Sequence, residues 1–193
     1  LDESMVIREV RLIEKKGGKS DLKAGRSRPI RAVVVVMSDS VSAGQKTDAS
    51  GRLIADRLRA EAVEVIECLM IPDDADTIER TLIRSADELA VDLVMTTGGT
   101  GLGPRDHTPE VMARVIEREA PGIAEAARAH GQERTPFSML SRGKAGIRGR
   151  TLIVNLPGSP RGVAESLDAL LRPILHAFPI MDGGGHTASA ANR

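Results

Sequence analysis

The stretch from Val91 to Glu110 has the sequence Val-Asp-Leu-Val-Met-Thr-Thr-Gly-Gly-Thr-Gly-Leu-Gly-Pro-Arg-Asp-His-Thr-Pro-Glu. Its first part, Val91–Thr96, is short, apolar and rich in β-branched residues, which predicts a buried strand. Four glycines follow within a few residues, and glycine lets the backbone approach a ligand closely. The stretch ends on Thr108, Pro109 and Glu110, which are residue types preferred at the N-cap and first turn of a helix. It therefore predicts a strand, a glycine-rich turn and a helix in succession.

The glycine-rich turn is a candidate anion site. Backbone N–H groups and a helix N-terminus at the end of a strand favour bound negative charge. Asp106 lies in the same turn, and a carboxylate beside phosphates needs a cation. The turn lacks the third glycine of the dinucleotide motif G-x-G-x-x-G, and no Lys-Ser/Thr follows to make a nucleoside triphosphatase loop. A tight connection that binds nothing is the alternative interpretation, and the glycines alone do not decide between the two.

Length and composition limit the classes of function. The 193 residues suffice for one domain with a sizeable core. Lys and Arg total 27, as do Asp and Glu, and the chain has two Phe with no Trp or Tyr. A neutral chain without aromatic stacking platforms gives no support for a nucleic-acid partner.

The single cysteine and the hydropathy pattern suggest the compartment. Cys68 is the only cysteine, so no intrachain disulfide is possible, which fits a reducing cytoplasm. Cys68 lies within an apolar run, and we expect it to fill the core rather than to act as a nucleophile. No apolar run reaches the length of a membrane span, and no secretory signal pattern is present. The sequence therefore predicts a cytoplasmic protein without a membrane partner.

Strand-like and helix-like patterns alternate along the chain. Strands are predicted at residues 31–37, 63–71, 91–96 and 151–156, and helices at 48–61, 76–89, 109–119, 123–130 and 160–172. Pro121-Gly122 is expected to end one helix, residues 131–150 to be rich in loops with a short helix at Pro136, and Pro173 to kink or restart the last helix. The alternation predicts an α/β fold, a three-layer sandwich with a mainly parallel central sheet.

Four predicted loops follow strands, at residues 38–47, 72–74, 97–108 and 157–160. In parallel sheets such loops gather at one edge, where ligands bind. That edge would combine the glycine-rich turn with Asp39, Asp73, Asp74 and Asp106, the parts needed for Mg²⁺ and polyphosphate. The alternatives are structural: an Asx turn for Asp39, and helix N-capping for one of Asp73 and Asp74.

Residues 97–110 resemble the signature of the MogA/MoaB family of molybdenum-cofactor biosynthesis. Five further matches follow in family order: Met37-Ser-Asp-Ser-Val-Ser-Ala-Gly44, Ile71-Pro-Asp-Asp74, Pro136-Phe-Ser-Met-Leu-Ser-Arg142, Ala145-Gly-Ile-Arg-Gly149 and Asn155-Leu-Pro-Gly-Ser-Pro160. The resemblance covers about residues 30–180. It implies the MogA/MoaB-like molybdopterin-binding fold, with residues 181–193 left as a Gly-, Ala- and Ser-rich tail expected to be disordered.

The activity that the resemblance implies is that of a molybdopterin adenylyltransferase. Its substrates would be molybdopterin and Mg-ATP, and its products adenylated molybdopterin and pyrophosphate. The matching catalytic residues are Asp73 and Asp106, which would also hold Mg²⁺. The residues implied to contact substrate are Asp39, Gly98, Gly99, Thr100, Gly101, Ser141, Pro157 and Gly158. Arg105, Arg142 and Lys144 either hold phosphates or are solvated surface charges.

The resemblance also implies partners and leaves one alternative function open. A MoeA-like molybdenum insertase would act downstream, and the chain would form trimers or, as in MoaB-like members, hexamers. The alternative is a non-catalytic molybdopterin-binding carrier or scaffold. Because a pure binder would not need both Asp73 and Asp106, their presence favours the enzyme.

The first residues resemble a different family. Residues 4–20 are similar to the C-terminal end of MoaC, the cyclic pyranopterin monophosphate synthase, and a polar, basic linker follows to Pro29. Residues 1–29 would then be a MoaC-like remnant with its linker, in a chain that is part of a fused pathway protein. A disordered leader is the alternative.

Overall fold

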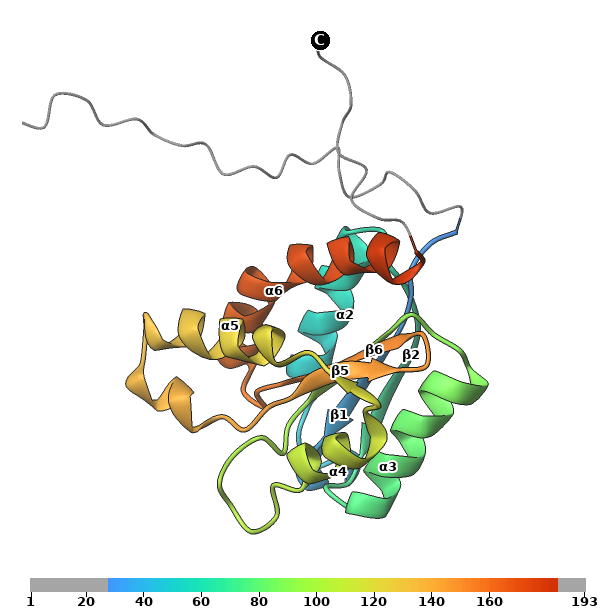
Figure 1. The fold of residues 1–193 in the computed structure, drawn as a ribbon. Helices are drawn as coiled ribbons and strands as arrows, with labels where there is room; N and C mark the ends of the chain where they lie inside the picture. Colours follow the sequence, from blue (N-terminus) through green and yellow to red (C-terminus); the bar gives the residue numbers. More distant parts are fainter. Residues whose placement is uncertain (1–27, 184–193) are drawn as a thin grey trace, which may run out of the picture.

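The structure, a computed structural model, describes residues 28–183. It contains a six-stranded sheet between two layers of helices (Figure 1). The strands are β1 Arg31–Met37, β2 Glu64–Ile71, β3 Leu93–Thr97, β4 Arg118–Glu119, β5 Ala145–Arg148 and β6 Thr151–Leu156. The helices are α1 Asp39–Ser42, α2 Ser50–Ala60, α3 Ala75–Ile83 with its π-helical continuation η1 Arg84–Glu88, α4 Thr108–Val115, α5 Pro121–Gln132, the 3₁₀ helix η2 Pro136–Leu140 and α6 Pro160–Met181.

The sheet is mainly parallel, as predicted. Its strand order is β2-β1-β3-β6-β5-β4. The first four strands in that order are parallel to one another, whereas β5 is antiparallel to β6 and β4 is antiparallel to β5. The carboxyl ends of the four parallel strands therefore share one edge, and the loops that follow them start there.

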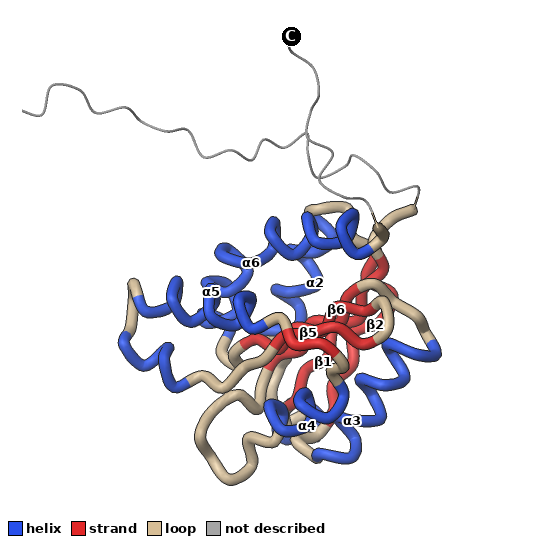
Figure 2. Tube along the Cα trace, viewed as in Figure 1, coloured by secondary structure: helices blue, strands red, loops and turns tan. Residues whose placement is uncertain are grey.

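The continuous apolar run of β1 is explained by helices on both faces of the sheet (Figure 2). Ala32 and Val34 point into a core that contains residues of α2 and α6, whereas Val33, Val35 and Met37 point into a core with residues of α3 and α4. A strand buried on both faces needs no polar alternation, which is typical of central parallel strands. The prediction of a three-layer α/β sandwich is confirmed.

The last helix differs from the prediction. The helix does not restart at Pro173, since α6 runs through both Pro173 and Pro179 to Met181. Its buried face continues on both sides of Pro173, with Leu170 before it and Ile174 and Phe178 after it. Packing of this face against the sheet holds the helix in one piece although each proline removes a backbone donor.

The region between β3 and β6 also differs. The helix predicted over 109–119 ends at Val115, and Arg118–Glu119 instead forms the short strand β4. Pro121 does not end that helix but opens α5, at a position where proline is favoured because its missing N–H is not needed. Residues 145–148, expected in a loop, form β5, whereas the short helix expected at Pro136 is present as η2.

Two further expectations concern Cys68 and the ends of the chain. Cys68 is exposed and not in the core, because β2 is the edge strand of the sheet. The MoaC-like segment lies outside the described residues, as does the predicted tail from residue 184 on. Within residues 28–183, no helix has both the length and the apolar character that crossing a membrane requires.

Candidate active site

The loops after the parallel strands meet at the carboxyl edge of the sheet. The Gly98 amide donates to the Leu156 carbonyl at 3.2 Å, which joins the loops that follow β3 and β6. The Ser50 hydroxyl donates to the Gly158 carbonyl at 2.9 Å, which ties α2 to the turn after β6. The Ser38 amide donates to the Ile71 carbonyl at 3.0 Å, which joins the ends of β1 and β2.

Two glycines of the glycine-rich turn allow close contacts that a side chain would disturb. Gly98 has φ +108°, and a Cβ there would lie 2.3 Å from the Met37 carbonyl oxygen. A Cβ on Gly101 would lie 2.8 Å from the Asp106 Oδ2 atom. These glycines therefore let the turn pack against the end of β1 and let the Asp106 carboxylate fold back over it.

The Asp106 carboxylate is fixed within its own loop. Its Oδ2 atom accepts a hydrogen bond from the Gly103 amide at 2.8 Å, and its amide donates to the Gly103 carbonyl at 3.1 Å. The predicted cap at Thr108 is not formed: Thr108 is the first residue of α4, and its hydroxyl is buried without a partner among the described residues.

Asp73 is a partly buried acid of the site with an unpartnered oxygen. Its Oδ1 atom is buried and has no hydrogen-bond partner within residues 28–183. Burial raises the pKa of Asp73 above its ordinary value of 3.8, and the negative charges of Asp39 and Asp106 raise it further, whereas the Arg105 charge lowers it. A carboxylate that is partly desolvated and surrounded by like charge is typical of a functional site.

Asp39 and Asp74 have structural roles at this edge. One Asp39 oxygen accepts from the Asp73 amide at 3.0 Å, and the other pairs with Arg105 Nη1 at 2.7 Å. Asp39 therefore holds the backbone at Asp73 and pairs with Arg105, and its contact with substrate stays a prediction. Asp74 caps α3, since its Oδ2 atom accepts from the Thr77 amide at 2.8 Å, which confirms the capping alternative for one of the two neighbours.

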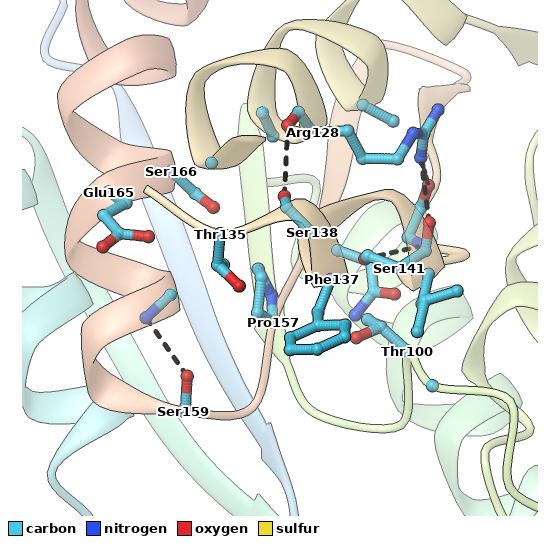
Figure 3. Close-up of a pocket in the computed structure, with 18 of the residues that line it drawn as sticks. Thr100, Arg128, Thr135, Phe137, Ser138, Ser141, Pro157, Ser159, Glu165 and Ser166 are labelled. Carbon is cyan, nitrogen blue, oxygen red and sulfur yellow. Dashed lines mark hydrogen bonds between the residues drawn. The ribbon is translucent and has the colours of Figure 1, made fainter. Parts of the chain in front are cut away.

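A cavity of about 300 Å³ opens beside the turn, between β6, α5, η2 and α6 (Figure 3). Thr100, Ser141 and Pro157, three residues predicted to contact substrate, line it, and Gly101 contributes as well. Thr100 is buried, and the carbonyl of Pro157 accepts from the Thr97 hydroxyl at 2.6 Å. Phe137 also lines this cavity although it is 74% exposed.

A second cavity, of about 390 Å³, lies on the other side of the turn. Gly98, Gly99 and Gly158 line it, together with residues that follow β1 and begin α2. All eight residues predicted to contact substrate thus lie along the carboxyl edge. Four of them line the first cavity and three line the second, whereas Asp39 lines neither. Of the predicted phosphate donors, the Gly98 N–H already donates to the Leu156 carbonyl and so is used within the fold.

Asn155 is a residue of this site that the sequence prediction missed. It is 6% exposed, and its Nδ2 atom donates to Thr96 Oγ1 at 2.9 Å and to the Gly98 carbonyl at 3.2 Å. Its Oδ1 atom is buried without a partner among the described residues, and the residue lines the cavity of Figure 3. The signal in the sequence was a single amide inside the otherwise apolar run that ends at Leu156.

The acidic residues suit Mg²⁺ only when the phosphates of a substrate supply further ligands. No group of three or more His, Cys, Asp or Glu side chains suited to a metal lies among residues 28–183. Mg²⁺ is commonly held by one or two carboxylates plus substrate phosphates and water. Asp73 has an unpartnered oxygen and lies close enough to Asp106 for the Asp106 charge to raise its pKa. This arrangement suits a magnesium site of that kind.

The three basic residues left open by the sequence have partners in the protein. Arg105 pairs with Asp39, and Lys144 pairs with Glu119 at 2.7 Å. Arg142 forms an ion pair with Glu110 and donates to two carbonyls of the glycine-rich loop. Each of the three is thus engaged within the protein.

Comparison with known proteins identifies the family. The family described as "Probable molybdopterin binding domain" matches residues 33–177 of the chain. The chain belongs to this molybdopterin-binding family. The resemblance that the sequence motifs indicated is therefore confirmed at the level of the family.

Individual relatives have names that refer to molybdopterin or to molybdenum cofactor biosynthesis. A bifunctional protein of molybdenum cofactor biosynthesis from Chlorobaculum tepidum is 38% identical over 186 residues, which cover 96% of this chain and 58% of that protein. The chain thus spans less than two thirds of this relative. A molybdopterin adenylyltransferase from Helicobacter pylori is 38% identical over 152 residues, 78% of this chain and 86% of that enzyme. The crystal structure of the molybdopterin biosynthesis enzyme MoaB from Thermus thermophilus is 44% identical, with a TM-score of 0.74, and covers 80% of this chain and 97% of its own.

Proposed function

We propose that this member of the molybdopterin-binding family is a molybdopterin adenylyltransferase that uses ATP. The name of the Helicobacter pylori relative supports this activity, because that enzyme and this chain share 38% of their residues over most of both lengths. The site at the carboxyl edge of the sheet supports it independently.

The observation that carries the proposal is the state of Asp73. Its buried, unpartnered oxygen and the neighbouring Asp39 and Asp106 charges work against stability in the absence of a ligand. A cation that bridges Asp73 to a phosphate would give the oxygen a partner and offset the repulsion between the carboxylates. The two cavities on either side of the adjoining turn provide space for two substrates.

The reaction joins the terminal phosphate of molybdopterin to the α-phosphorus of ATP. An oxygen of the terminal phosphate forms the new bond, the bond from the α-phosphorus to its bridging oxygen breaks, and pyrophosphate leaves with that oxygen. The protein contributes mainly positioning and electrostatic stabilisation to such an in-line transfer. The amides of Gly99, Thr100 and Gly101 and the Thr100 hydroxyl are the candidate donors to phosphate in this turn.

Mg²⁺, held by Asp73 and Asp106, would neutralise negative charge that develops on the departing pyrophosphate. The residues of the chain prepare for this in two ways. Asp39 orients Asp73 through the Asp73 amide, and the Gly103 amide orients the Asp106 carboxylate. The Asp106 carboxylate and the backbone that carries Asp73 are thereby held before substrate binds.

The cavity of Figure 3 is the proposed place of the pterin. Ser141 and Thr100 supply hydroxyl groups, and Pro157 forms part of a wall. The free Oδ1 atom of Asn155 would accept a hydrogen bond from an N–H group of the ligand, because its Nδ2 atom is held by Thr96 and Gly98.

The extent and context of the protein complete the proposal. We place the catalytic domain at residues 30–180, after a MoaC-like remnant and linker at 1–29 and before a tail at 181–193. The match to the Chlorobaculum tepidum bifunctional protein supports a fused origin, because it covers 96% of the chain and so includes most residues before the domain. A cytoplasmic homotrimer or hexamer that passes its product to a MoeA-like insertase is the corresponding cellular setting.

The experiment is molybdopterin-dependent release of pyrophosphate from Mg-ATP. We expect release by the wild type and none by Asp106→Asn. Wild-type protein that binds molybdopterin but releases no pyrophosphate would replace the enzyme by a carrier or scaffold module.

A further inference from the structure

Arg142 lies at the junction between the pterin cavity and the catalytic loop. It directly follows Ser141, which lines the cavity, and its backbone amide donates to the Thr100 carbonyl at 2.8 Å. The segment after η2 therefore runs beside the glycine-rich turn.

The Arg142 side chain uses all three of its nitrogens on the loop and on the helix that follows it. Nε donates to the Gly101 carbonyl at 2.7 Å, and Nη2 donates to the Asp106 carbonyl at 2.6 Å. Nη1 forms an ion pair with Glu110 in the first turn of α4. A guanidinium presents its donors in a rigid fork, so one side chain fixes three acceptors at once.

These contacts hold a loop that is otherwise open to solvent. Residues 102–105 are exposed, whereas Arg142 grips the carbonyls at positions 101 and 106, immediately before and after them. Inside the loop, Gly103 and Asp106 bond to each other, and the His107 amide donates to the Arg105 carbonyl. A further link to the fold is the ion pair of Arg105 with Asp39, which is exposed at both side chains and therefore weak. We expect the position of the Asp106 carboxylate relative to Asp73 to depend chiefly on Arg142.

We propose that Arg142 is a positioning residue that holds Asp106 opposite Asp73, and that it does so in place of binding a substrate phosphate. The consequence for the metal rests on the proposed function, because it assumes that the two carboxylates bind a divalent cation. The loop anchoring itself does not depend on any activity.

Two variants of Arg142 distinguish the effect of its forked guanidinium from the effect of its positive charge. Arg142→Lys keeps the positive charge but cannot reach three acceptors, and Arg142→Ala removes the side chain beyond Cβ. Lys144→Gln is the matched control, because Lys144 lies two residues along and makes one ion pair, with Glu119, away from the loop.

The first measurement is hydrogen exchange of the ligand-free protein, followed in a peptide that covers residues 101–107. Local opening that costs less free energy exposes amides more often. We expect exchange in this peptide to rise by about tenfold in Arg142→Lys and Arg142→Ala, with no change in Lys144→Gln and none in a peptide from β3.

The second measurement is binding of Mn²⁺, a paramagnetic probe for Mg²⁺, in the presence of ATP. We expect both Arg142 variants to bind Mn²⁺ more weakly than the wild type by about tenfold, through the disordered second carboxylate, and Lys144→Gln to bind it normally. This readout requires no turnover. A wild type that fails to release pyrophosphate would refute the proposed function and leave the result for Arg142 intact.

Two outcomes would overturn the role of Arg142. Unchanged exchange at residues 101–107 in Arg142→Ala would show that the loop holds itself. Faster exchange with unaltered Mn²⁺ binding in both variants would show that Arg142 only stabilises the loop and does not position Asp106.

Discussion

At the scale of single residues, the site is organised around carboxylates with unequal duties. Asp39 uses both oxygens within the protein, Asp74 caps a helix, and Asp106 is held by the amide of Gly103. Burial raises the pKa of Asp73, and the charges of its neighbours Asp39 and Asp106 raise it further. An acid in this state destabilises the ligand-free fold whenever it is ionised.

Asp73→Asn is therefore expected to stabilise the protein and to abolish turnover. Because the folded-state pKa of Asp73 lies above its unfolded value, the destabilisation is absent below the ordinary value of 3.8 and complete above the folded-state pKa. The melting temperature of the variant should exceed that of the wild type at pH 7, by a few degrees, and the difference should shrink towards about pH 3. Calorimetry at both pH values checks this, and equal gains at both would contradict the electrostatic explanation.

Two substitutions should move the pH dependence of the reaction in opposite directions. Asp39→Asn removes a negative charge that raises the pKa of Asp73, so the acid limb of pyrophosphate release should move to lower pH. Arg105→Gln removes a positive charge that lowers this pKa, so the limb should move to higher pH. The dependence of the rate on pH, followed from about pH 3 to about pH 8, measures the direction of both shifts. Shifts in the same direction would refute the assignment of the limb to Asp73.

At the scale of elements, the long apolar patterns were predictable and the short or edge elements were not. β1, β3 and β6 are buried on both faces, so their apolar runs identify them directly. β4 has two residues and β5 has four, too few to show any period. They join the sheet only through tertiary pairing, β5 with β6 and β4 with β5. Cys68 is exposed because β2 is an edge strand. The order of strands in a sheet cannot be read from a local sequence pattern, so the exposure was not predictable.

The candidate site divides in the same way. Asp73, Asp106 and the glycine-rich turn could be predicted because they follow strands that end at one edge. The free oxygen of Asn155 and the grip of Arg142 could not, because both depend on contacts across more than 30 positions. Which polar atom of a buried side-chain amide, the oxygen or the nitrogen, has a partner is decided by packing and is not encoded in spacing.

Helix α6 gives a prediction about stability at this scale. Pro173 is exposed inside the helix and removes a backbone hydrogen bond, so Pro173→Ala should raise the free energy of unfolding by about 1–3 kcal/mol. Pro160→Ala is the control in the same helix, because proline at the first helical position is harmless and the change there should be under about 0.5 kcal/mol. Urea unfolding measures both. Equal effects would show that position within the helix does not matter.

At the scale of the whole molecule, the two edges of the sheet have separate tasks. The site occupies the carboxyl edge, whereas β1 begins and α6 ends on the opposite side of the sheet (Figure 1). There Arg28 donates to both Asp92 oxygens, at 2.7 and 2.8 Å, and Asp92 also accepts from the Arg31 amide. The hydrogen bonds to Asp92 raise the pKa of Arg28, and the charge of Asp182 at the end of α6 raises it further. Arg28 and the start of β1 are thus anchored away from the site.

This anchor should affect stability and not catalysis. Asp92 is 4% exposed, and Asp92→Ala leaves its donors unpaired, which should cost about 1.5–3 kcal/mol. Asp168→Ala breaks only the exposed ion pair with Arg57 and should cost less than about 1 kcal/mol. Chemical denaturation gives both values, and pyrophosphate release below the melting temperature should match the wild type in each. A loss of rate in Asp92→Ala with the fold intact would show that the two edges are coupled.

The measurement that tests the central claim most directly compares Asp106→Asn with Asp74→Asn in molybdopterin-dependent pyrophosphate release, with molybdopterin binding followed in parallel. Both variants lose one negative charge at the same edge, but Asn still caps α3 at position 74, whereas at 106 it cannot help to hold the cation. We expect Asp74→Asn to retain the wild-type rate, and Asp106→Asn to bind molybdopterin and release no pyrophosphate. Release by Asp106→Asn at the wild-type rate would contradict the account.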